Sequence, residues 1–197
     1  MRAAILDAAR TLLLADGVEG LSMRAIAREL GYSPAGLYEY FPSKEMVTCA
    51  LFFEGSEGLA GHMQGALDAL PADASDVDRL RAIGRTYRDY AKTQPDLYLL
   101  TFGGRADWMD RGLESAEERH VAFDLLVQVV EDGLRSGGFI ETPAQPLAIA
   151  AWSGIHGFVM LEVSGFLDRM LEPESPETLD RLFESALNVF ENGYRRR

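Results

Sequence analysis

Apolar residues recur every three or four positions along most of the chain, and this spacing is typical of one face of an α-helix. A clear short example is residues 22–30, where Met23, Ile26, Ala27 and Leu30 would share one face. No stretch alternates apolar and polar residues over the length of a convincing strand. The pattern therefore predicts an all-α protein of about nine helices.

Two short helices joined by a tight turn are predicted near the amino terminus. Ser22 can cap the first of them, and Gly31 allows the left-handed backbone that ends it. Ser33 and Pro34 follow as a cap and a first-position proline, so they begin a second helix. We expect this second helix to run to Phe41, before a further proline stops it.

The second helix carries small and polar atoms on its outer face, so that face can enter the major groove of DNA. Hydroxyl groups and cations suited to phosphate oxygens surround the face. The residues predicted to contact DNA are Ser22, Arg24, Ser33, Pro34, Ala35, Gly36, Tyr38, Glu39, Tyr40 and Lys44. The simpler alternative is a three-helix corner whose tyrosines only pack.

The segment from Ile5 to Leu51 resembles the amino-terminal domain of the TetR family of bacterial transcriptional repressors. The matching residues are Ile5, Leu6, Ala8, Ala9, Leu12, Leu13, Gly17, Ile26, Ala27, Gly31, Ser33, Leu37, Tyr38, Tyr40, Phe41, Ser43, Lys44 and Glu45. This resemblance implies phosphate contacts at Ser22, Tyr38 and Lys44, and an approach to base edges at Ala35, Gly36 and Glu39. Glu39 departs from the pattern, because a carboxylate repels phosphate unless it accepts a hydrogen bond from a cytosine amino group.

We expect two domains: a helix-turn-helix DNA-binding domain over residues 1–47, and a helical effector-binding and dimerisation domain over residues 48–197. In the second domain, the helix from Pro146 to about Leu167 is apolar on nearly every face and is expected to be buried on all sides. The last helix carries one apolar stripe. These two helices are predicted to pair with their copies in a four-helix dimer interface. Its residues would be Phe158, Leu161, Leu179, Leu182, Phe183, Ala186 and Phe190.

Residues 151–157 resemble the Trp-x-x-x-His-Gly signature of one carboxy-terminal domain type in this family. Trp152 and His156 lie one turn apart, so they share a face that could line a ligand cavity. The residues predicted to line it are Tyr87, Tyr90, Phe102, Trp108, Phe123, Trp152, His156 and Met160. The alternative is a packed core, in which His156 donates to a backbone carbonyl or a carboxylate.

The net charge of −12 is distributed unevenly along the 197 residues. Residues 1–50 carry a net charge of only −1, so most of the negative charge belongs to the rest of the chain. An acidic body repels DNA everywhere except at the amino-terminal head. Because one head has few cations, two heads acting together on a two-fold site are needed, and this favours a homodimer.

The sequence contains no nucleophile elbow, phosphate loop, zinc-protease or dinucleotide motif, so we predict that the protein is not an enzyme and uses no cofactor. Three separated histidines and a lone Cys49 predict no metal site and no disulfide. The apolar stretch from Leu147 to Phe158 is too short to cross a bilayer, and nothing resembles a signal peptide. We therefore expect a cytoplasmic protein with no membrane partner.

Together these features predict a DNA-binding transcriptional regulator that acts as a homodimer. It would be a repressor released from operator DNA by a small apolar or aromatic effector. Two alternatives stay open: a DNA-binding regulator without an effector, and an all-helical ligand-binding or oligomerisation protein that does not bind DNA.

Overall fold

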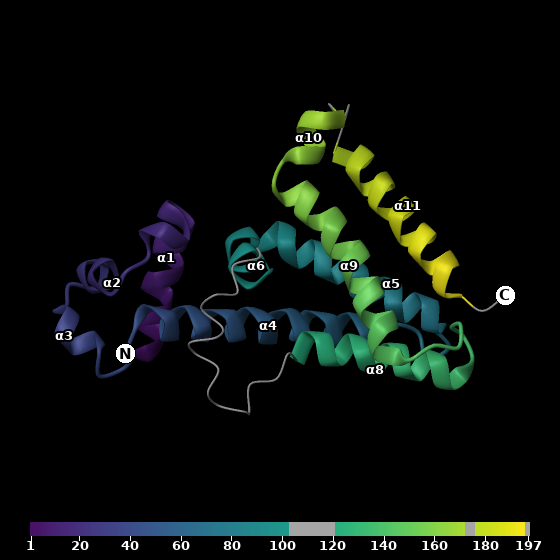
Figure 1. Ribbon diagram of the computed structural model, residues 1–197, viewed down its shortest axis with the longest axis horizontal. Coiled ribbons are helices and arrows are strands. Elements are labelled where there is room, and N and C mark those ends of the chain that lie inside the picture. Colours follow the sequence, from purple (N-terminus) through teal and green to yellow (C-terminus); the bar gives the residue numbers. More distant parts are fainter. Residues whose placement is uncertain (103–120, 172–175, 196–197) are drawn as a thin grey trace. The chain divides into compact units, whose positions relative to one another are not determined.

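The computed structural model describes residues 1–102, 121–171 and 176–195. Within these ranges the chain forms ten α-helices (Figure 1). The one β-type pairing among these residues is an isolated antiparallel bridge between Phe139 and Arg195. The predicted all-α fold class is confirmed, with one helix more in the described ranges than the sequence pattern suggested.

The chain divides into two compact units, which are described one at a time. The described residues of the first unit are 1–57 and 94–102, and those of the second are 58–93, 121–171 and 176–195. This division is one of packing, and the functional boundary after residue 47 stays a prediction.

The first unit is built around a cluster of buried apolar side chains. Its helices are α1 (Arg2–Gly20), α2 (Met23–Leu30), α3 (Pro34–Leu37), the first part of α4 (Lys44–Asp68), and α6 (Pro95–Phe102). The fully buried members of the cluster include Ile5, Ile26, Leu37, Phe41, Val47 and Leu51. These side chains come from α1 to α4 and from the segment after α3. One core therefore holds the short helices α2 and α3 against α1 and α4.

Local hydrogen bonds explain where α2 begins and ends. The Ser22 hydroxyl oxygen accepts from the Ala25 amide at 3.1 Å, so the predicted cap is confirmed. Gly31 has a φ of 68°, and the Tyr32 amide donates back to the Ala27 carbonyl at 2.9 Å. This left-handed ending is the one expected from the glycine.

Helix α3 differs from the prediction in two respects. Pro34 is its first residue, but Ser33 makes no side-chain cap hydrogen bond. The helix ends at Leu37 rather than Phe41, and residues 38–40 form a turn. The amides of Tyr40 and Phe41 both donate to the Leu37 carbonyl at 3.0 Å, so the chain tightens there instead of continuing as α-helix.

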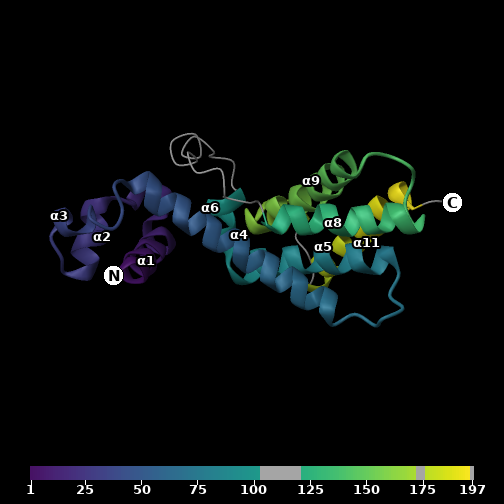
Figure 2. The ribbon, with the colours of Figure 1, turned by 90° about the horizontal axis from the view of Figure 1, so that it is seen from below.

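The second unit is a layered bundle, in which α5, α8, α9 and α11 lie together in both views (Figures 1 and 2). Its helices are α5 (Asp76–Thr93), α8 (Val121–Ser136), α9 (Ala144–Val163), α10 (Phe166–Leu171), α11 (Pro176–Tyr194) and the last part of α4. Ser75 caps α5: its hydroxyl accepts from the Asp78 amide at 3.2 Å, and the Asp78 carboxylate accepts from the Ser75 amide at 3.1 Å.

The helix expected from Pro146 to about Leu167 is in fact two helices. Gly165, with a φ of 70°, separates α9 from α10. The expectation that this region is buried on all sides is also wrong for the single chain. Val159 is fully buried, whereas Ile149 and Leu161 are 46% and 43% exposed. One face of α9 is therefore available at the surface of the chain.

By length and composition, the 20 residues of α9 could span a membrane, so the expectation that no apolar run is long enough was wrong. The contacts of the helix nevertheless fit a core helix of a helical bundle. Its Glu162 is buried and ion-paired with Arg88 of α5, and its His156 hydrogen-bonds with Tyr87 of α5. Such polar contacts with a neighbouring helix are typical of a packed protein interior.

A ladder of ion pairs joins α5 to α11. Arg81 pairs with Glu191 at 2.5 Å, Arg85 with Glu184 at 2.7 Å, and Arg88 with Asp180 at 2.8 Å, so the two helices run antiparallel. The buried Arg88 also donates from Nε to Glu162 of α9 at 2.7 Å and lies 4.7 Å from the centre of the Phe183 ring. Arg88 thus ties α5 to both α9 and α11.

Candidate functional site

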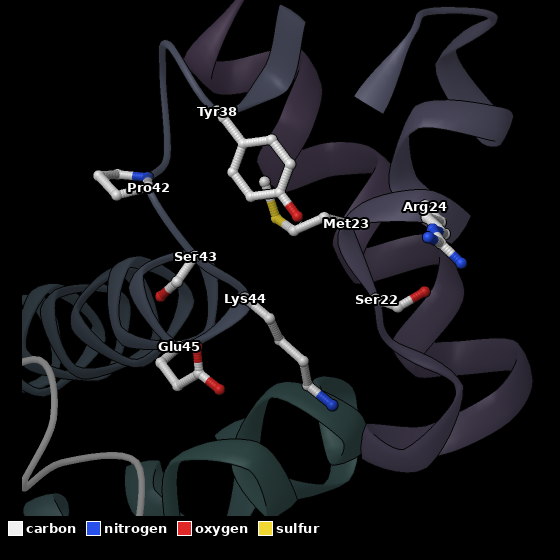
Figure 3. Close-up of a pocket in the computed structure, with 8 residues that line it drawn as sticks. All are labelled: Ser22, Met23, Arg24, Tyr38, Pro42, Ser43, Lys44 and Glu45. Carbon is white, nitrogen blue, oxygen red and sulfur yellow. The ribbon is translucent and has the colours of Figure 1, made fainter. Parts of the chain in front are cut away.

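Three residues from separate elements line one open pocket of about 430 Å³ in the first unit (Figure 3). Ser22 precedes α2, Tyr38 follows α3, and Lys44 is the first residue of α4. The other lining residues are Met23, Arg24, Pro42, Ser43 and Glu45. The fold therefore brings together the three side chains for which the family resemblance implied phosphate contacts.

The first turns of α2 and α4 position these side chains. The Ser43 hydroxyl accepts from the Met46 amide at 3.3 Å, which caps α4 and places Lys44 in its first turn. The Ser22 oxygen is engaged with the Ala25 amide, and its hydroxyl hydrogen can still donate. Figure 3 shows Ser22 and Arg24 on the α2 side of the pocket, Tyr38 on the α3 side and Lys44 on the α4 side. Hydroxyl and ammonium donors around one opening suit an oxyanion.

The outer face of α3 is open beside this pocket. Of the ten residues predicted to contact DNA, Gly36 and Lys44 are half-buried and the other eight are exposed. A Cβ atom at Gly36 would meet only the Ser33 hydroxyl, at 3.8 Å. The small residues of α3 therefore leave space outside the helix, while Leu37 on the opposite side is buried in the core.

Four of the residues predicted to line a ligand cavity lie together in the second unit. The Trp152 indole N–H donates to the Tyr87 hydroxyl at 3.2 Å, and that hydroxyl is hydrogen-bonded to His156 Nδ1 at 2.9 Å. The Phe123 ring lies 5.9 Å from the Trp152 ring, and the Trp152 and His156 rings are 5.7 Å apart. We call Tyr87, Phe123, Trp152 and His156 the aromatic cluster. At Nδ1, His156 has a tyrosine hydroxyl as its hydrogen-bond partner.

Burial lowers the pKa of the His156 imidazole below its ordinary value of 6.5. The neutral ring is therefore favoured in the folded chain. A neutral His156 can accept the Tyr87 hydroxyl hydrogen at Nδ1, because the Tyr87 oxygen accepts from Trp152. This gives a directed chain of hydrogen bonds from Trp152 through Tyr87 to His156.

Two more of the predicted cavity residues, Tyr90 and Met160, belong to the second unit. Tyr90 is buried in the second unit, where its ring lies 5.6 Å from the His62 ring. Met160 is half-buried, one turn beyond His156 on α9.

The last two predicted cavity residues do not belong to the described part of the second unit. Phe102 is in the first unit, where its ring lies 5.3 Å from the Tyr98 ring, and Trp108 lies outside the described residues.

The predicted dimer residues divide into buried and accessible positions. Leu179 and Phe183 are buried within the single chain, and the Phe183 ring packs 5.3 Å from that of Phe158. This differs from the expectation that the whole stripe faces a partner. Leu161 and Leu182 are exposed, whereas Phe158, Ala186 and Phe190 are half-buried. The sequence reasoning missed Val189, which is 69% exposed and lies two turns beyond Leu182 on the same helix.

Both regions of the chain match models of one protein family. Residues 5–48 match the model described as bacterial regulatory proteins of the tetR family, and residues 80–190 match the tetracyclin repressor-like carboxy-terminal domain. The HTH-type transcriptional regulator Rv1816 of Mycobacterium tuberculosis is 35% identical over 103 residues, which cover 52% of this chain and 44% of that regulator. The chain thus matches less than half the length of that relative. An uncharacterized HTH-type transcriptional regulator of the same organism, Rv0681, is 27% identical over 171 residues, covering 85% of this chain and 72% of the relative.

Solved structures share the fold over nearly the whole chain. A protein of unknown function from Rhodococcus sp. RHA1 has a TM-score of 0.76 at 25% identity, covering 99% of this chain and 95% of that one. The fatty acid degradation regulator FadR from Bacillus halodurans has a TM-score of 0.72 at 18% identity, covering 100% and 97%, and this likeness concerns the fold alone. Since the carboxy-terminal model alone matches more than half of the residues, the chain belongs to the tetR family of bacterial regulatory proteins.

Proposed function

We propose that this protein is a transcriptional repressor that binds double-stranded operator DNA through α2, α3 and the start of α4. The observation that carries the proposal is the convergence of Ser22, Tyr38 and Lys44 on one open pocket beside α3. A phosphate oxygen there would accept hydrogen bonds from two hydroxyls and an ammonium group. Contacts of this kind fix a reading helix in register on the duplex.

The exposed face of α3 is the proposed reading surface. Ala35 and Gly36 allow the backbone to approach the major groove closely, because neither carries a bulky side chain. Glu39 is exposed on the same segment and would accept a hydrogen bond from a cytosine amino group. Ser33, Pro34 and Tyr40 border this surface.

Capture of genomic fragments by the full-length protein, followed by a gel-shift assay on the retained fragment, tests this proposal. We expect a specific complex that survives an excess of unrelated competitor DNA. Retention of no fragment, or equal competition by unrelated DNA, would instead favour an all-helical protein without specific DNA binding. A reporter gene joined to the fragment gives the sign of regulation, because a repressor lowers expression of the reporter.

We further propose that the protein is a cytoplasmic homodimer whose subunits meet through the accessible faces of α9 and α11. Leu161 on α9 and Leu182 and Val189 on α11 provide exposed apolar side chains there. A dimer would present two reading heads to a two-fold operator, which compensates for the few cations on each head.

The second unit is the proposed effector domain, of the type that carries the Trp-x-x-x-His-Gly signature. A small apolar or aromatic molecule would bind beside the aromatic cluster, where rings give contact area and the Tyr87 hydroxyl and His156 imidazole give polar anchors. Such a ligand acts by favouring one spacing of the two heads over another.

A regulator without an effector is the second candidate. Its support is that Trp152, Tyr87 and His156 satisfy one another by hydrogen bonds, as in a packed core. The two candidates differ in the result of a thermal-shift screen with apolar and aromatic compounds. An effector site gives a hit that also weakens the DNA complex, and a packed core gives none.

A further inference from the structure

Arg2, in the first turn of α1, reaches a segment 38 residues further along the chain. One of its guanidinium N–H groups donates to the Tyr40 carbonyl at 2.8 Å. The same guanidinium lies 4.2 Å from the centre of the Phe41 ring. Two independent contacts of one side chain therefore fall on adjacent residues, between the end of α3 and Pro42.

The Tyr40 carbonyl lies in the turn that follows α3, outside the hydrogen-bond ladder of that helix. Helix α3 ends at Leu37, and the last carbonyls of a helical stretch have no partner inside it. Pro42 cannot continue the helix because it has no N–H. The Arg2 guanidinium supplies a charge-assisted donor to this carbonyl.

The ring beneath the guanidinium is a fixed platform. Phe41 is completely buried in the core of the first unit, so its position is set by that core. A planar guanidinium can stack on such a ring while it donates to a carbonyl, which an ammonium group cannot do in the same way. A positive charge in the first turn of α1 is unfavourable for α1 itself, so the contribution of Arg2 lies at the distant segment.

We propose that Arg2 is a positioning residue for DNA binding. It holds residues 38–41 so that Tyr38 faces the pocket that it shares with Ser22 and Lys44. Arg2 is not among the residues that line this pocket, so it acts through the segment and not through the phosphate. This inference rests on the proposed function, because it assigns a role in the same DNA-binding unit.

The first experiment compares operator affinity and its salt dependence for the full-length wild type, Arg2→Met and Arg2→Lys. For Arg2→Met we expect about a tenfold weaker complex, with an unchanged slope of affinity against salt concentration. Arg2→Lys should recover only part of the affinity, since it keeps the charge and loses the stacked fork.

Three outcomes of that experiment overturn the proposal. A slope reduced by about one in Arg2→Met, with full recovery in Arg2→Lys, makes Arg2 a direct phosphate contact. Affinity within about twofold of the wild type leaves Arg2 without a role in binding. A loss of affinity that simply follows the unfolded fraction, measured by circular dichroism, makes Arg2 a stabilising residue only.

The second experiment needs no DNA. The amides of Tyr40 and Phe41 both bond to the Leu37 carbonyl. Their hydrogen-exchange rates therefore report how often the segment of residues 38–41 opens. Arg2→Met should speed exchange at both amides by about tenfold and leave the Ile26 amide, which bonds to Ser22 in the same unit, unchanged. Arg28→Met removes one exposed cation from α2 and is the charge-matched control. It should leave the exchange rates of the Tyr40, Phe41 and Ile26 amides unchanged.

The two experiments separate failure of this proposal from failure of the proposed function. Unchanged exchange at Tyr40 and Phe41 in Arg2→Met refutes the positioning role, whatever the DNA result. A wild-type chain that binds no DNA fragment refutes the proposed function instead, and the exchange rates still decide whether Arg2 holds the segment.

Discussion

At the scale of single residues, the fold shifts the protonation equilibrium of His156. Burial lowers the pKa of its imidazole, so the folded chain resists a proton that the unfolded chain accepts at the ordinary pKa of 6.5. Stability carried by the neutral ring is therefore complete above that pKa. It decreases as the pH falls below 6.5, and the decrease stops once the folded chain is protonated too.

We predict that the free energy of unfolding decreases as the pH falls from about 6.5 to about 5.5, and that His156→Asn removes part of this decrease. The asparagine amide oxygen can still accept the Tyr87 hydroxyl hydrogen, but the side chain does not titrate. Urea denaturation of both proteins across this range is the measurement. Parallel pH dependences for the wild type and the variant would show that His156 does not carry the effect.

The pocket beside α3 gives a second residue-scale prediction. Lys44→Met should weaken DNA binding across sequences and reduce the salt slope by about one, because it removes a charged phosphate contact. Tyr38→Phe should weaken binding about fivefold through loss of one hydroxyl, with the slope unchanged.

Lys92→Met is the matched control for the charge, since Lys92 is an exposed lysine on α5 of the second unit. It should leave affinity and slope unchanged. An equal effect of Lys44→Met and Lys92→Met would mean that the lysine acts through net charge and not through a contact.

Residues whose role is local were predictable from the sequence. The Ser22 cap and the Gly31 ending depend on atoms within five positions of each residue, so the sequence contains the whole signal. Arg2 and Arg88 were missed because their partners lie 38 and 74 residues away. From the sequence alone, an arginine in an amphipathic helix is expected on the solvated face, and only the folded structure shows a distant partner.

At the scale of elements, the ion pairs that join α5 to α9 and to α11 differ in burial. The side chains of Arg88 and Glu162 are both 7% exposed, whereas those of Arg85 and Glu184 are 50% and 39% exposed. Breaking a buried pair leaves an uncompensated charge inside the protein, and breaking an exposed pair leaves it in water. The buried pair should therefore contribute more to the free energy of unfolding than the exposed pair.

We predict that Glu162→Gln destabilises the chain by up to about 3–5 kcal/mol, because the buried Arg88 guanidinium keeps only the exposed carboxylate of Asp180 as an ion-pair partner. Glu184→Gln, the control at an exposed rung, should cost at most about 1 kcal/mol. Chemical denaturation measures both. Equal costs would contradict the assignment of Arg88 as the tie between α5, α9 and α11.

The break between α9 and α10 shows why the ends of elements were harder to predict than their existence. Gly154, Gly157 and Gly165 all lie in one apolar stretch, and the sequence does not separate their roles. Gly154 allows close packing, since a Cβ there would come within 2.5 Å of the Phe190 ring. Only Gly165 has a positive φ and ends the helix. Tertiary packing makes this distinction.

At the scale of the whole molecule, the fold class and the helix-turn-helix unit were predictable because they rest on short-range periodicity and capping. The surface of the second unit was not. Leu179 and Phe183 belong to the same apolar stripe as Leu182 and Ala186, yet the first two are buried within the chain. Which part of a stripe faces its own subunit depends on the neighbouring helices.

This division gives the prediction for assembly. Val189→Asp should dissociate the proposed homodimer at micromolar concentration without unfolding the chain, because Val189 is 69% exposed in the single chain. Burying a carboxylate in an apolar interface is costly, whereas exposing it is not. A charge at Phe183 would be uninformative, since it would disrupt the core.

Ile140→Asp is the matched control for the dimer test: Ile140 is 41% exposed and lies before α9, outside the proposed interface. Sedimentation velocity should show a monomer for Val189→Asp and a dimer for the wild type and the control. A dimeric Val189→Asp variant would exclude this face of α11 from the interface.

Helix α3 is proposed to enter the major groove, and Gly36→Trp would place a bulky ring on the face that enters it. Gly36 and Gly61 are both helical glycines with free space around them, so Gly61→Trp on α4 is the matched control. Binding of each full-length variant to the captured operator fragment is measured by fluorescence anisotropy, with folding checked by circular dichroism. We predict that Gly36→Trp abolishes specific binding while Gly61→Trp binds like the wild type. Wild-type affinity in a folded Gly36→Trp variant would show that α3 does not enter the major groove.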